Sequence, residues 1–333
     1  MVLEPGNDPR DLVRGLGLQA RHVYDSVLHG FAADLTPAQP ERVRRVPAVA
    51  STEADQVVRA DATQRVAGLY GLDRTDQRAL PLSGTYTCRS TTSTVKAHVI
   101  DTGIATGHAD FGGRAQNVYD ASGQRGADCH GTHVAGTLGG TTHGIAKGVR
   151  LLGVRVLDCS GSGANSGVIA GLDWVRTHAT GASVADLSLS SGYSPALNRA
   201  AADLAASGVF VAVAAGNTGS NACHASPSSA SAVFTVAASD RTDTRASFSN
   251  NGSCVDAYAP GVGIISTWLT GTRTLSGTSM AGPHVAGVAA LSKATNGQTA
   301  SATLGRWLKD TATPSRIRGN PTGTPDRLLF NGL

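Results

Sequence analysis

The stretch SVADLSLSSGYSPALNRAAADLAASGVFVAVAAG, residues 183–216, decides the fold class. It opens with an apolar run over 183–190 that predicts a strand, and it closes with a second apolar run over 209–216. Between them, residues 195–208 carry a helical pattern. A strand, a helix and a strand in this order indicate two parallel strands joined by a crossover helix.

The same alternation extends over most of the chain. Further strands are predicted over 95–100, 150–157 and 232–239, and further helices over 166–179 and 278–295. Strands that alternate with helices favour an α/β fold in which helices cover both faces of a parallel sheet. Such sheets bind ligands at the carboxyl ends of their strands, so functional residues are expected there.

Composition and charge narrow the class of protein. The 333 residues are 41% hydrophobic and 16% charged, which predicts a sizeable core and excludes a disordered chain. The net charge of +4 is too small to indicate nucleic-acid binding. The longest apolar run, near residues 208–216, is about half of a membrane span, so no membrane partner is expected.

Residues 1–61 form a separate pattern. A short helix is predicted at 8–17, two strands around a turn at 21–36, and a last strand at 55–61. A second helix is expected to start with Thr36 as its N-cap and Pro37 at its first position. The first strand, at 1–5, is weak, as a truncated start would make it. The pattern indicates a small α+β, ferredoxin-like domain.

Three stretches place a reactive side chain at a strand end or a helix start. Asp101 ends the apolar strand of AHVIDTGI (97–104), and His130 opens a helix in CHGTHVAG (129–136). Ser279 lies in a glycine-flanked turn before a helix in LSGTSMAGPHVAG (275–287). These are the parts of an acyl-transfer triad, in which the serine attacks, the imidazole takes its proton and the carboxylate orients the imidazole.

With their flanking residues, and in the chain order Asp, His, Ser, these motifs resemble the subtilisin-like serine proteases (subtilases), most of all the proteinase K branch. The resemblance runs from GLYGLDRTDQRALPLS (68–83) to the C-terminus, and residues 21–58 resemble the inhibitor prodomain of such enzymes. It implies a prodomain over 1–61 and a peptidase domain over 62–333. It also implies a monomeric serine endopeptidase, made as a self-processing zymogen that its own prodomain inhibits.

The resemblance also assigns site residues. The triad is Asp101, His130 and Ser279, and Asn217 supplies the oxyanion hole. Two segments bind the peptide substrate beside an apolar P1 pocket: Ser188, Leu189, Ser190 and Ala214, Ala215, Gly216. The chain departs from the family at Ser190 and Ser191, where Gly-Gly is usual, and at Gly282, where Thr, Ala or Ser is usual.

Calcium is the one cofactor implied by the resemblance, and its role is structural. One site takes the Asp256 carboxylate with the backbone oxygens of Ser231 and Val233. A second site takes Asp73, Asp76 and Gln77. Ordinary caps and salt-bridge partners are the alternative interpretation of both groups.

Five cysteines are present, and the relatives with disulfides pair two sets of them. Cys223 pairs with Cys254, and Cys129 pairs with Cys159, which leaves Cys88 over. The relatives read Cys-Asn-Gly-His where this chain reads Cys-His, so two residues are missing before His130. A zinc site at His130 and His133 is rejected because no glutamate lies nearby, and His133 and His284 are interpreted as structural.

Two disulfides indicate an oxidising compartment and a secreted protein. The N-terminus, MVLEPGNDPRDLVRG, shows no signal peptide, and a start placed too late or a trimmed chain would reconcile the two. Two alternatives stay open. One is a cytoplasmic peptidase that trims one precursor. The other is an inactive protease-like protein that binds peptides, favoured by the shortened loop before His130.

Overall fold

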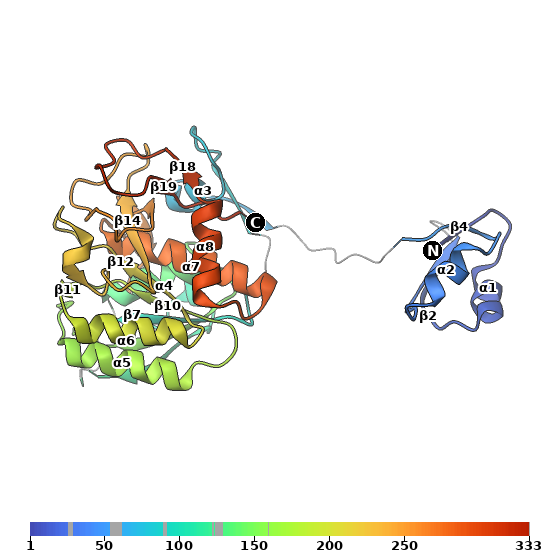
Figure 1. Ribbon diagram of the computed structural model, residues 1–333, viewed down its shortest axis with the longest axis horizontal. Coiled ribbons are helices and arrows are strands. Elements are labelled where there is room, and N and C mark those ends of the chain that lie inside the picture. Colours follow the sequence, from blue (N-terminus) through green and yellow to red (C-terminus); the bar gives the residue numbers. More distant parts are fainter. Residues whose placement is uncertain are drawn as a thin grey trace. The chain divides into compact units, whose positions relative to one another are not determined.

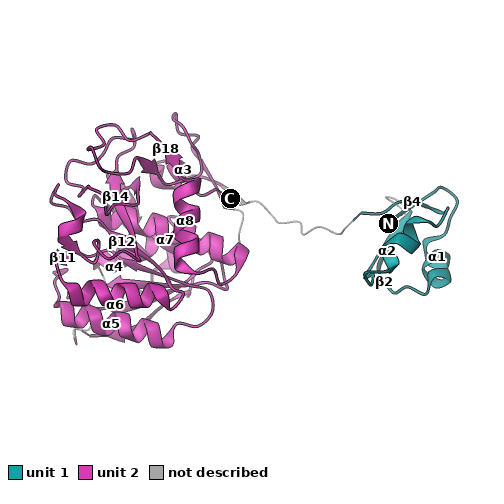
Figure 2. Cartoon of the chain, in the orientation of Figure 1, with its two compact units in different colours: residues 1–59 teal, residues 60–333 magenta. Residues whose placement is uncertain are grey.

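The structure is a computed structural model that describes residues 1–25, 29–53, 62–88, 92–121, 123, 129–158 and 160–332. The chain divides into two compact units, Met1–Arg59 (unit 1) and Ala60–Leu333 (unit 2) (Figure 2). Among the described residues, no helix is both long enough and apolar enough to cross a membrane.

Unit 1 is a four-stranded antiparallel sheet with two helices. The strands lie in the order β2 (Ala20–Tyr24), β3 (Gly30–Ala33), β1 (Val2–Leu3) and β4 (Val49–Ser51). The predicted weak first strand is therefore present, and the predicted helix at 8–17 is α1 (Pro9–Leu16). The strand expected at 55–61 lies outside the described residues.

The second helix of unit 1 begins later than predicted. α2 spans Gln39–Arg44 and has Ala38, not Thr36, at its N-cap. The backbone N–H of Gln39 donates to the carbonyl of Thr36 (3.0 Å), but the next residue, Pro40, has no N–H to donate. The first turn therefore stays outside the helix.

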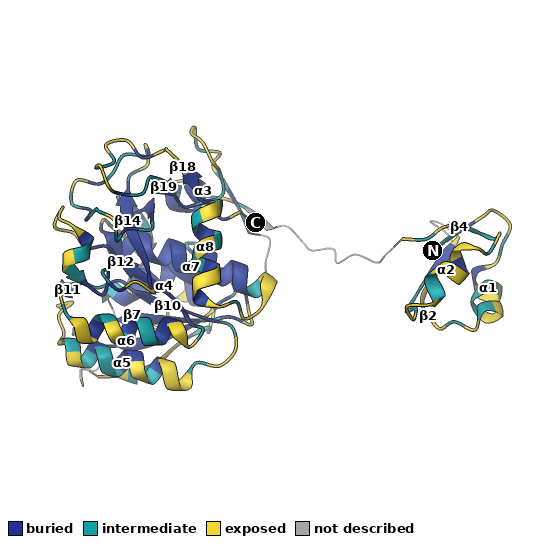
Figure 3. Cartoon of the chain, in the orientation of Figure 1, coloured by how far each residue is buried: buried dark blue, intermediate teal, exposed yellow. Residues whose placement is uncertain are grey.

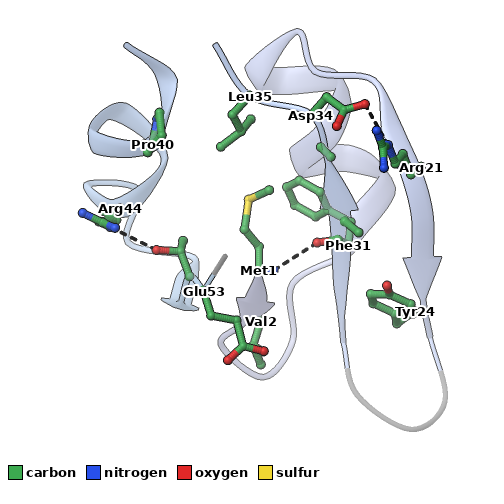
Figure 4. A pocket seen from close by; sticks show the side chains of 13 residues that line it. Met1, Val2, Arg21, Tyr24, Phe31, Asp34, Leu35, Pro40, Arg44 and Glu53 are labelled. Carbon is green, nitrogen blue, oxygen red and sulfur yellow. Dashed lines mark hydrogen bonds and ion pairs between the residues drawn. The ribbon is translucent and has the colours of Figure 1, made fainter. Parts of the chain in front are cut away.

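A small core and an adjoining cavity complete unit 1. Leu3, Phe31 and Val43 are buried. The cavity has a volume of about 510 Å³, and Tyr24, Phe31, Leu35, Pro40 and Arg44 are among the residues that line it (Figure 4). The Arg21–Asp34 ion pair (2.7 Å) lies at its edge (Figure 4).

Unit 2 is built on a nine-stranded sheet, as the fold-class prediction requires (Figure 1). All neighbouring strands run parallel except the pair β18 and β19 at one end of the sheet, which is antiparallel. Along the sheet the order is β18 (Thr313–Pro314), β19 (Arg327–Leu328), β15 (Ala257–Pro260), β14 (Phe234–Ser239), β12 (Phe210–Ala214), β10 (Ser183–Leu187), β7 (Lys96–Asp101), β9 (Arg150–Arg155), β8 (Ala115–Asp120). The 183–216 stretch is thus β10 and β12, paired directly.

Helices cover both faces of this sheet. α5 (Asn165–His178) and α6 (Pro195–Ala206) pack on one face over one apolar cluster. α4 (Cys129–Gly139) and α7 (Thr278–Asn296) pack on the other face over a larger cluster. In Figure 3, α5 and α6 turn exposed residues outward, whereas residues 278–293 of α7 are all buried. α7 is therefore a core helix.

The remaining elements of unit 2 are short. They are β5 (Ala62–Arg65), α3 (Tyr70–Thr75), β6 (Thr85–Cys88), η1 (Ala109–Phe111), β11 (Ser191–Gly192), η2 (Ala222–His224), β13 (Ala225–Ser226), β16 (Ile264–Thr267), β17 (Thr272–Leu275) and α8 (Ser301–Thr311). β16 and β17 form an antiparallel hairpin that packs against α4.

A buried ion pair ties α3 to the loop after β14. The Arg74 side chain is 1% exposed, and its Nε and Nη2 donate to the two carboxylate oxygens of Asp243 at 2.7 and 3.0 Å. Two parallel hydrogen bonds make this a strong, directional contact. The Asp243 side chain is only 7% exposed, so both charges are largely shielded from water and each depends on the other.

Substitution of Arg74 by Met leaves the Asp243 carboxylate buried without its counter-charge. We expect the free energy of unfolding to fall by about 3–5 kcal/mol, measured by urea denaturation. The matched control is Arg199→Met, which breaks the Arg199–Asp203 pair, whose side chains are 79% and 46% exposed. That control loses less than about 1 kcal/mol. Equal losses in the two variants would contradict the prediction.

Candidate active site

The predicted triad residues come from three elements that meet at one end of the sheet. Asp101 is the last residue of β7, His130 lies in the first turn of α4, and Ser279 lies in the first turn of α7. β7 is a central strand flanked by β9 and β10. The carboxyl ends of parallel strands share one edge of the sheet, so residues 29 to 178 positions apart converge there.

Asp101 holds the imidazole of His130. Both carboxylate oxygens lie 2.9 Å from Nδ1 of His130, and the carboxylate is fully buried. An ionised carboxylate only accepts hydrogen bonds, so Nδ1 carries a proton and Nε2 is the basic nitrogen. Burial lowers the pKa of His130, but the attraction and hydrogen bond of Asp101 outweigh it, and the pKa lies above its ordinary value.

Ser279 and His130 line the same cleft, which has a volume of about 750 Å³. The Ser279 hydroxyl donates to the backbone carbonyl of Ser188 at 3.1 Å. Transfer of its proton to His130 therefore requires the hydroxyl to rotate away from Ser188. The start of α7 directly behind Ser279 places backbone N–H groups where negative charge would develop.

Asn217 follows β12 on the wall of the same cleft. Its Oδ1 accepts hydrogen bonds from the backbone N–H of Thr278 (2.8 Å) and from the Thr278 hydroxyl (3.0 Å). The orientation of the amide is therefore set, and its NH₂ group is left to face away from Thr278. The role of Thr278 as an anchor for this amide was missed by sequence reasoning, although Thr278 lies inside the GTS motif.

The two predicted substrate segments differ in their relation to the cleft. Ser188, Leu189 and Ser190 line it. Ala214 and Ala215 are buried, and Gly216 has φ +102°, a conformation that favours glycine. These three lead into Asn217 and are not among the described cleft-lining residues.

Part of the cleft wall comes from segments that carried no motif. Residues 160–163 line the cleft, and so do Trp268 and Arg273 of the β16–β17 hairpin. The guanidinium of Arg273 lies 4.5 Å from the centre of a Trp268 ring. His133 is one of the two histidines interpreted as structural. Its Nε2 lies 3.1 Å from the carbonyl oxygen of Ile264 and 3.0 Å from that of Arg273, so His133 joins α4 to this hairpin.

One of the two predicted disulfides is formed. Cys223 and Cys254 are bonded, 31 residues apart. Cys129 is the first residue of α4, lines the cleft and has no disulfide partner among the described residues. Cys159 lies outside the described residues, so the Cys129–Cys159 pairing stays a prediction.

The Asp73 and Asp76 group fits a cation in part. Asp73 accepts hydrogen bonds from the backbone N–H groups of Ser83 (3.0 Å) and Gly84 (2.7 Å). Asp76 has one buried carboxylate oxygen, Oδ1, without a partner among the described residues. Burial, with the nearby Asp73 charge, raises the pKa of Asp76 to about 6. Gln77 instead turns its amide onto Ala79, Pro81 and Ser83.

The Asp256 group fits a cation less well. Asp256 Oδ2 accepts from the N–H of Thr235 (2.9 Å), and Oδ1 pairs with the ammonium of Lys309 (3.2 Å). Lys309 already supplies the positive charge that calcium would bring. Ser231 and Val233 lie in the turn just before β14. Among the described residues, no group of three or more His, Cys, Asp or Glu side chains is placed to hold a metal.

Comparison with known proteins matches both units. Residues 92–329 match the Subtilase family, and residues 17–61 match the Peptidase inhibitor I9 family. An extracellular serine proteinase of Thermus sp. (strain Rt41A) is 48% identical, covering 99% of this chain and 84% of the relative. Proteinase R of Parengyodontium album is 43% identical, covering 94% of this chain and 82% of the relative.

A solved structure agrees with these matches. The crystal structure of a cold-adapted subtilisin-like serine proteinase superposes with a TM-score of 0.76 at 47% identity, covering 79% of this chain and 97% of that chain. The fold and the sequence of this chain thus indicate the same family. The chain therefore belongs to the subtilase family of serine proteinases and carries a peptidase inhibitor I9 region ahead of its proteinase domain.

Proposed function

We propose that this chain is a secreted serine endopeptidase, made as a zymogen, that hydrolyses peptide bonds through an acyl-enzyme on Ser279. The observation that carries the chemistry is the contact of both Asp101 oxygens with Nδ1 of His130, beside a serine on the same cleft. Secretion is supported by the extracellular Thermus relative and by the disulfide between Cys223 and Cys254.

In the first half of the reaction, Ser279 Oγ bonds to the scissile carbonyl carbon while its proton moves to Nε2 of His130. The carbonyl oxygen becomes an anion, which the Asn217 NH₂ group and the Ser279 backbone N–H stabilise. Asp101 stabilises the imidazolium and does not take its proton. The intermediate collapses, the C–N bond breaks, and His130 protonates the departing amine.

In the second half, water replaces the amine. His130 takes a proton from the water as its oxygen bonds to the acyl carbon, and it returns that proton to Ser279 Oγ as the acid product leaves. The chain's own residues therefore supply every proton transfer, and the cycle ends with the enzyme unchanged.

The substrate is an extended peptide that pairs with two backbone segments, Ser188, Leu189, Ser190 and Ala214, Ala215, Gly216. Large apolar side chains fit the expected P1 pocket. Ser190 distinguishes this chain, because its Oγ lies 3.4 Å from the position that a Cβ on Gly216 would take. The Ser190 side chain therefore reaches the second segment and narrows the P1 entrance.

Unit 1 is the inhibitor in this proposal. Residues 17–61 match the I9 family, and the chain is cut between residues 60 and 65 to separate a prodomain, 1–61, from a proteinase domain, 62–333. The mature enzyme acts as a monomer. The prodomain inhibits the proteinase until it is removed.

Calcium is a structural cofactor in this proposal. Asp76 and Asp73 would hold it, because Asp76 Oδ1 is buried without a partner among the described atoms. Subtilases commonly bind calcium. At Asp256, with the carbonyls of Ser231 and Val233, calcium would have to displace Lys309. Bound calcium would screen the two carboxylates from each other and take no part in peptide hydrolysis.

Substitution of Ser279 by Ala tests the proposed function directly. The unchanged chain is expected to convert itself to a product that lacks unit 1 and to digest a denatured protein, whereas the variant does neither. The readouts are product mass and substrate turnover. Ser276→Ala, at an exposed serine in the same motif, is the control and keeps both activities. Full inhibition by a thiol alkylator, with no effect of a serine-directed sulfonyl fluoride, would contradict the assignment.

Substitution of Asn217 by Leu removes one oxyanion donor at nearly constant volume. We expect kcat to fall by about 10²–10³ with KM little changed, a magnitude established on subtilisin, a member of this family. Thr278→Val should give a smaller loss, because one of the two hydrogen bonds to Asn217 Oδ1 remains. A loss confined to KM would assign Asn217 to substrate binding instead.

Removal of calcium by a chelator is expected to lower the melting temperature more than it lowers turnover at moderate temperature. At a free concentration 100-fold above Kd, a bound ion contributes about 2.7 kcal/mol to the native state. Scanning calorimetry of the Ser279→Ala chain gives the measurement without self-digestion. Asp76→Asn should abolish the chelator effect. If Asp256→Asn abolishes it and Asp76→Asn does not, the ion binds at the Asp256 group.

A further inference from the structure

A carboxyl group that the mechanism leaves unused lies directly beneath the nucleophile. Asp186 is in β10, is 0% exposed, and pairs in register with Val99 of β7 and Ala212 of β12. Its Oδ2 lies 2.6 Å from the hydroxyl of Ser188. The same hydroxyl lies 2.9 Å from the backbone carbonyl oxygen of Ser279.

The Ser188 hydroxyl has one proton for these two contacts. The Ser279 carbonyl oxygen can only accept a hydrogen bond, and an ionised Asp186 could also only accept. If Asp186 were ionised, one of the two short contacts would join two oxygens without a hydrogen between them. Both contacts are hydrogen bonds only when Asp186 is protonated, donates to Ser188 and lets Ser188 donate to Ser279.

The sequence of α7 explains why the Ser279 carbonyl accepts from the Ser188 hydroxyl. In an α-helix that carbonyl would accept from the N–H four residues on, but residue 283 is proline, which has none. The Ser188 hydroxyl therefore substitutes for the missing helical donor. This requirement directs the single Ser188 proton toward Ser279 and away from Asp186.

The other oxygen of Asp186 gives a second, independent indication. Oδ1 is buried and has no hydrogen-bond partner among the described residues. It faces Gly282, where a Cβ would come within 2.7 Å of it. If Asp186 were ionised, one carboxylate oxygen would have no hydrogen-bond donor and the other would share the Ser188 hydroxyl with the Ser279 carbonyl. Burying such a charge costs much more free energy than burying a neutral acid.

We propose that Asp186 is held as a neutral carboxylic acid and is a positioning residue, which fixes the backbone of Ser279 through the chain Asp186 to Ser188 to Ser279. The inference rests on the proposed function only in naming Ser279 the nucleophile. Gly282 and Asp186 form a matched pair, because a larger residue at 282 would displace the acid.

The net effect of the surroundings on the carboxyl group acts in the same direction. Burial, and then the Asp101 carboxylate, raise the pKa of Asp186 to about 8 against the lowering by Ser188 and His130. The strand β12 carries no ionisable side chain. On α7, His284 lies against the Met280 carbonyl with its Nδ1, and Lys293 donates to the Gly208 carbonyl, so neither faces Asp186.

Alkaline pH should release this arrangement. A raised pKa means that the native state keeps a proton that the unfolded chain has lost. The stabilising effect is present at low pH and is lost as pH rises toward about 8. Once ionised, Asp186 accepts the hydrogen bond of the Ser188 hydroxyl, which leaves the Ser279 carbonyl without that donor and adds negative charge near His130.

The first test is calorimetry of the full chain carrying Ser279→Ala, with and without Asp186→Asn, between pH 5 and 10. Asn keeps an N–H donor for Ser188 but cannot ionise. The melting temperature of the Asp186→Asn chain minus that of its parent should increase by roughly 2–4 °C per pH unit up to about pH 8. Above that pH the difference should stay constant. Asp173→Asn, at an exposed aspartate on α5, is the control and leaves the pH dependence unchanged. Parallel curves for Asp186→Asn and its parent would overturn the proposal.

The second test uses the active enzyme. Between pH 7 and 9, kcat/KM of the unchanged enzyme should fall about tenfold as Asp186 ionises, while that of Asp186→Asn stays within about twofold. A purely structural role would change activity equally at every pH. Loss of all turnover in the unchanged enzyme would refute the proposed function, yet the calorimetric result would still decide the state of Asp186.

If Asp186→Asn does not fold, infrared difference spectroscopy of the Ser279→Ala chain decides. A protonated carboxyl band at neutral pH that disappears above about pH 8 supports the proposal, and Ser188→Ala should shift that band because it removes the acceptor. A spectrum with only ionised carboxylates at neutral pH would overturn it.

Discussion

The burial of α7 against the parallel sheet is the interaction on which the site depends. Residues 278–293 of this helix are buried, and its packing requires small side chains. At Gly287 a Cβ would come within 2.6 Å of the Cβ of Ile145, and at Gly136 of α4 it would meet the β16–β17 hairpin. This close packing fixes the start of α7 relative to the ends of β10 and β12. The position of Ser279 is fixed with it.

Around that helix start, polar groups are shared between elements. Ser188 of the segment after β10 accepts from the Ser279 hydroxyl and donates to the Ser279 carbonyl. The backbone N–H of Thr278 donates to Oδ1 of Asn217, which lies in the segment after β12. The Thr278 hydroxyl oxygen accepts from the N–H of Gly216 in the same segment. Ser279 and the Asn217 amide are therefore held by the same strands that lead into the two predicted substrate segments. This arrangement couples the proposed binding geometry to the proposed reaction geometry.

Buried charge is handled in three different ways in this fold. Arg74 and Asp243 neutralise each other through two parallel hydrogen bonds. Asp101 accepts hydrogen bonds from Nδ1 of His130 and from the backbone N–H of Thr102. Asp186 lacks donors of this kind, and its neutrality follows from what surrounds it. An aspartate side chain is thus an ion-pair partner, a hydrogen-bond acceptor that orients an imidazole, or a neutral acid, according to the donors within reach.

The sequence by itself determined the fold class, and it predicted the three residues of the proposed triad. Periodicity predicted the β10–α6–β12 unit, because a buried strand and an amphipathic helix differ in their apolar repeat. Asp101, His130 and Ser279 carried recognisable flanking residues, so their pattern indicated chemistry before any geometry. The start of α2 was predicted wrongly, because the missing N–H of Pro40 outweighed the cap signal of Thr36.

Only the tertiary structure decided the contacts between elements distant in the sequence. Thr278 orients Asn217 across 61 residues, Lys309 reaches Asp256 across 53, and Ser188 joins Asp186 to Ser279 across 91. No periodicity records such contacts, since each depends on which strand lies beside which and on where a helix ends. Protonation depends on the same contacts, because the donors around a carboxyl group determine whether it is charged.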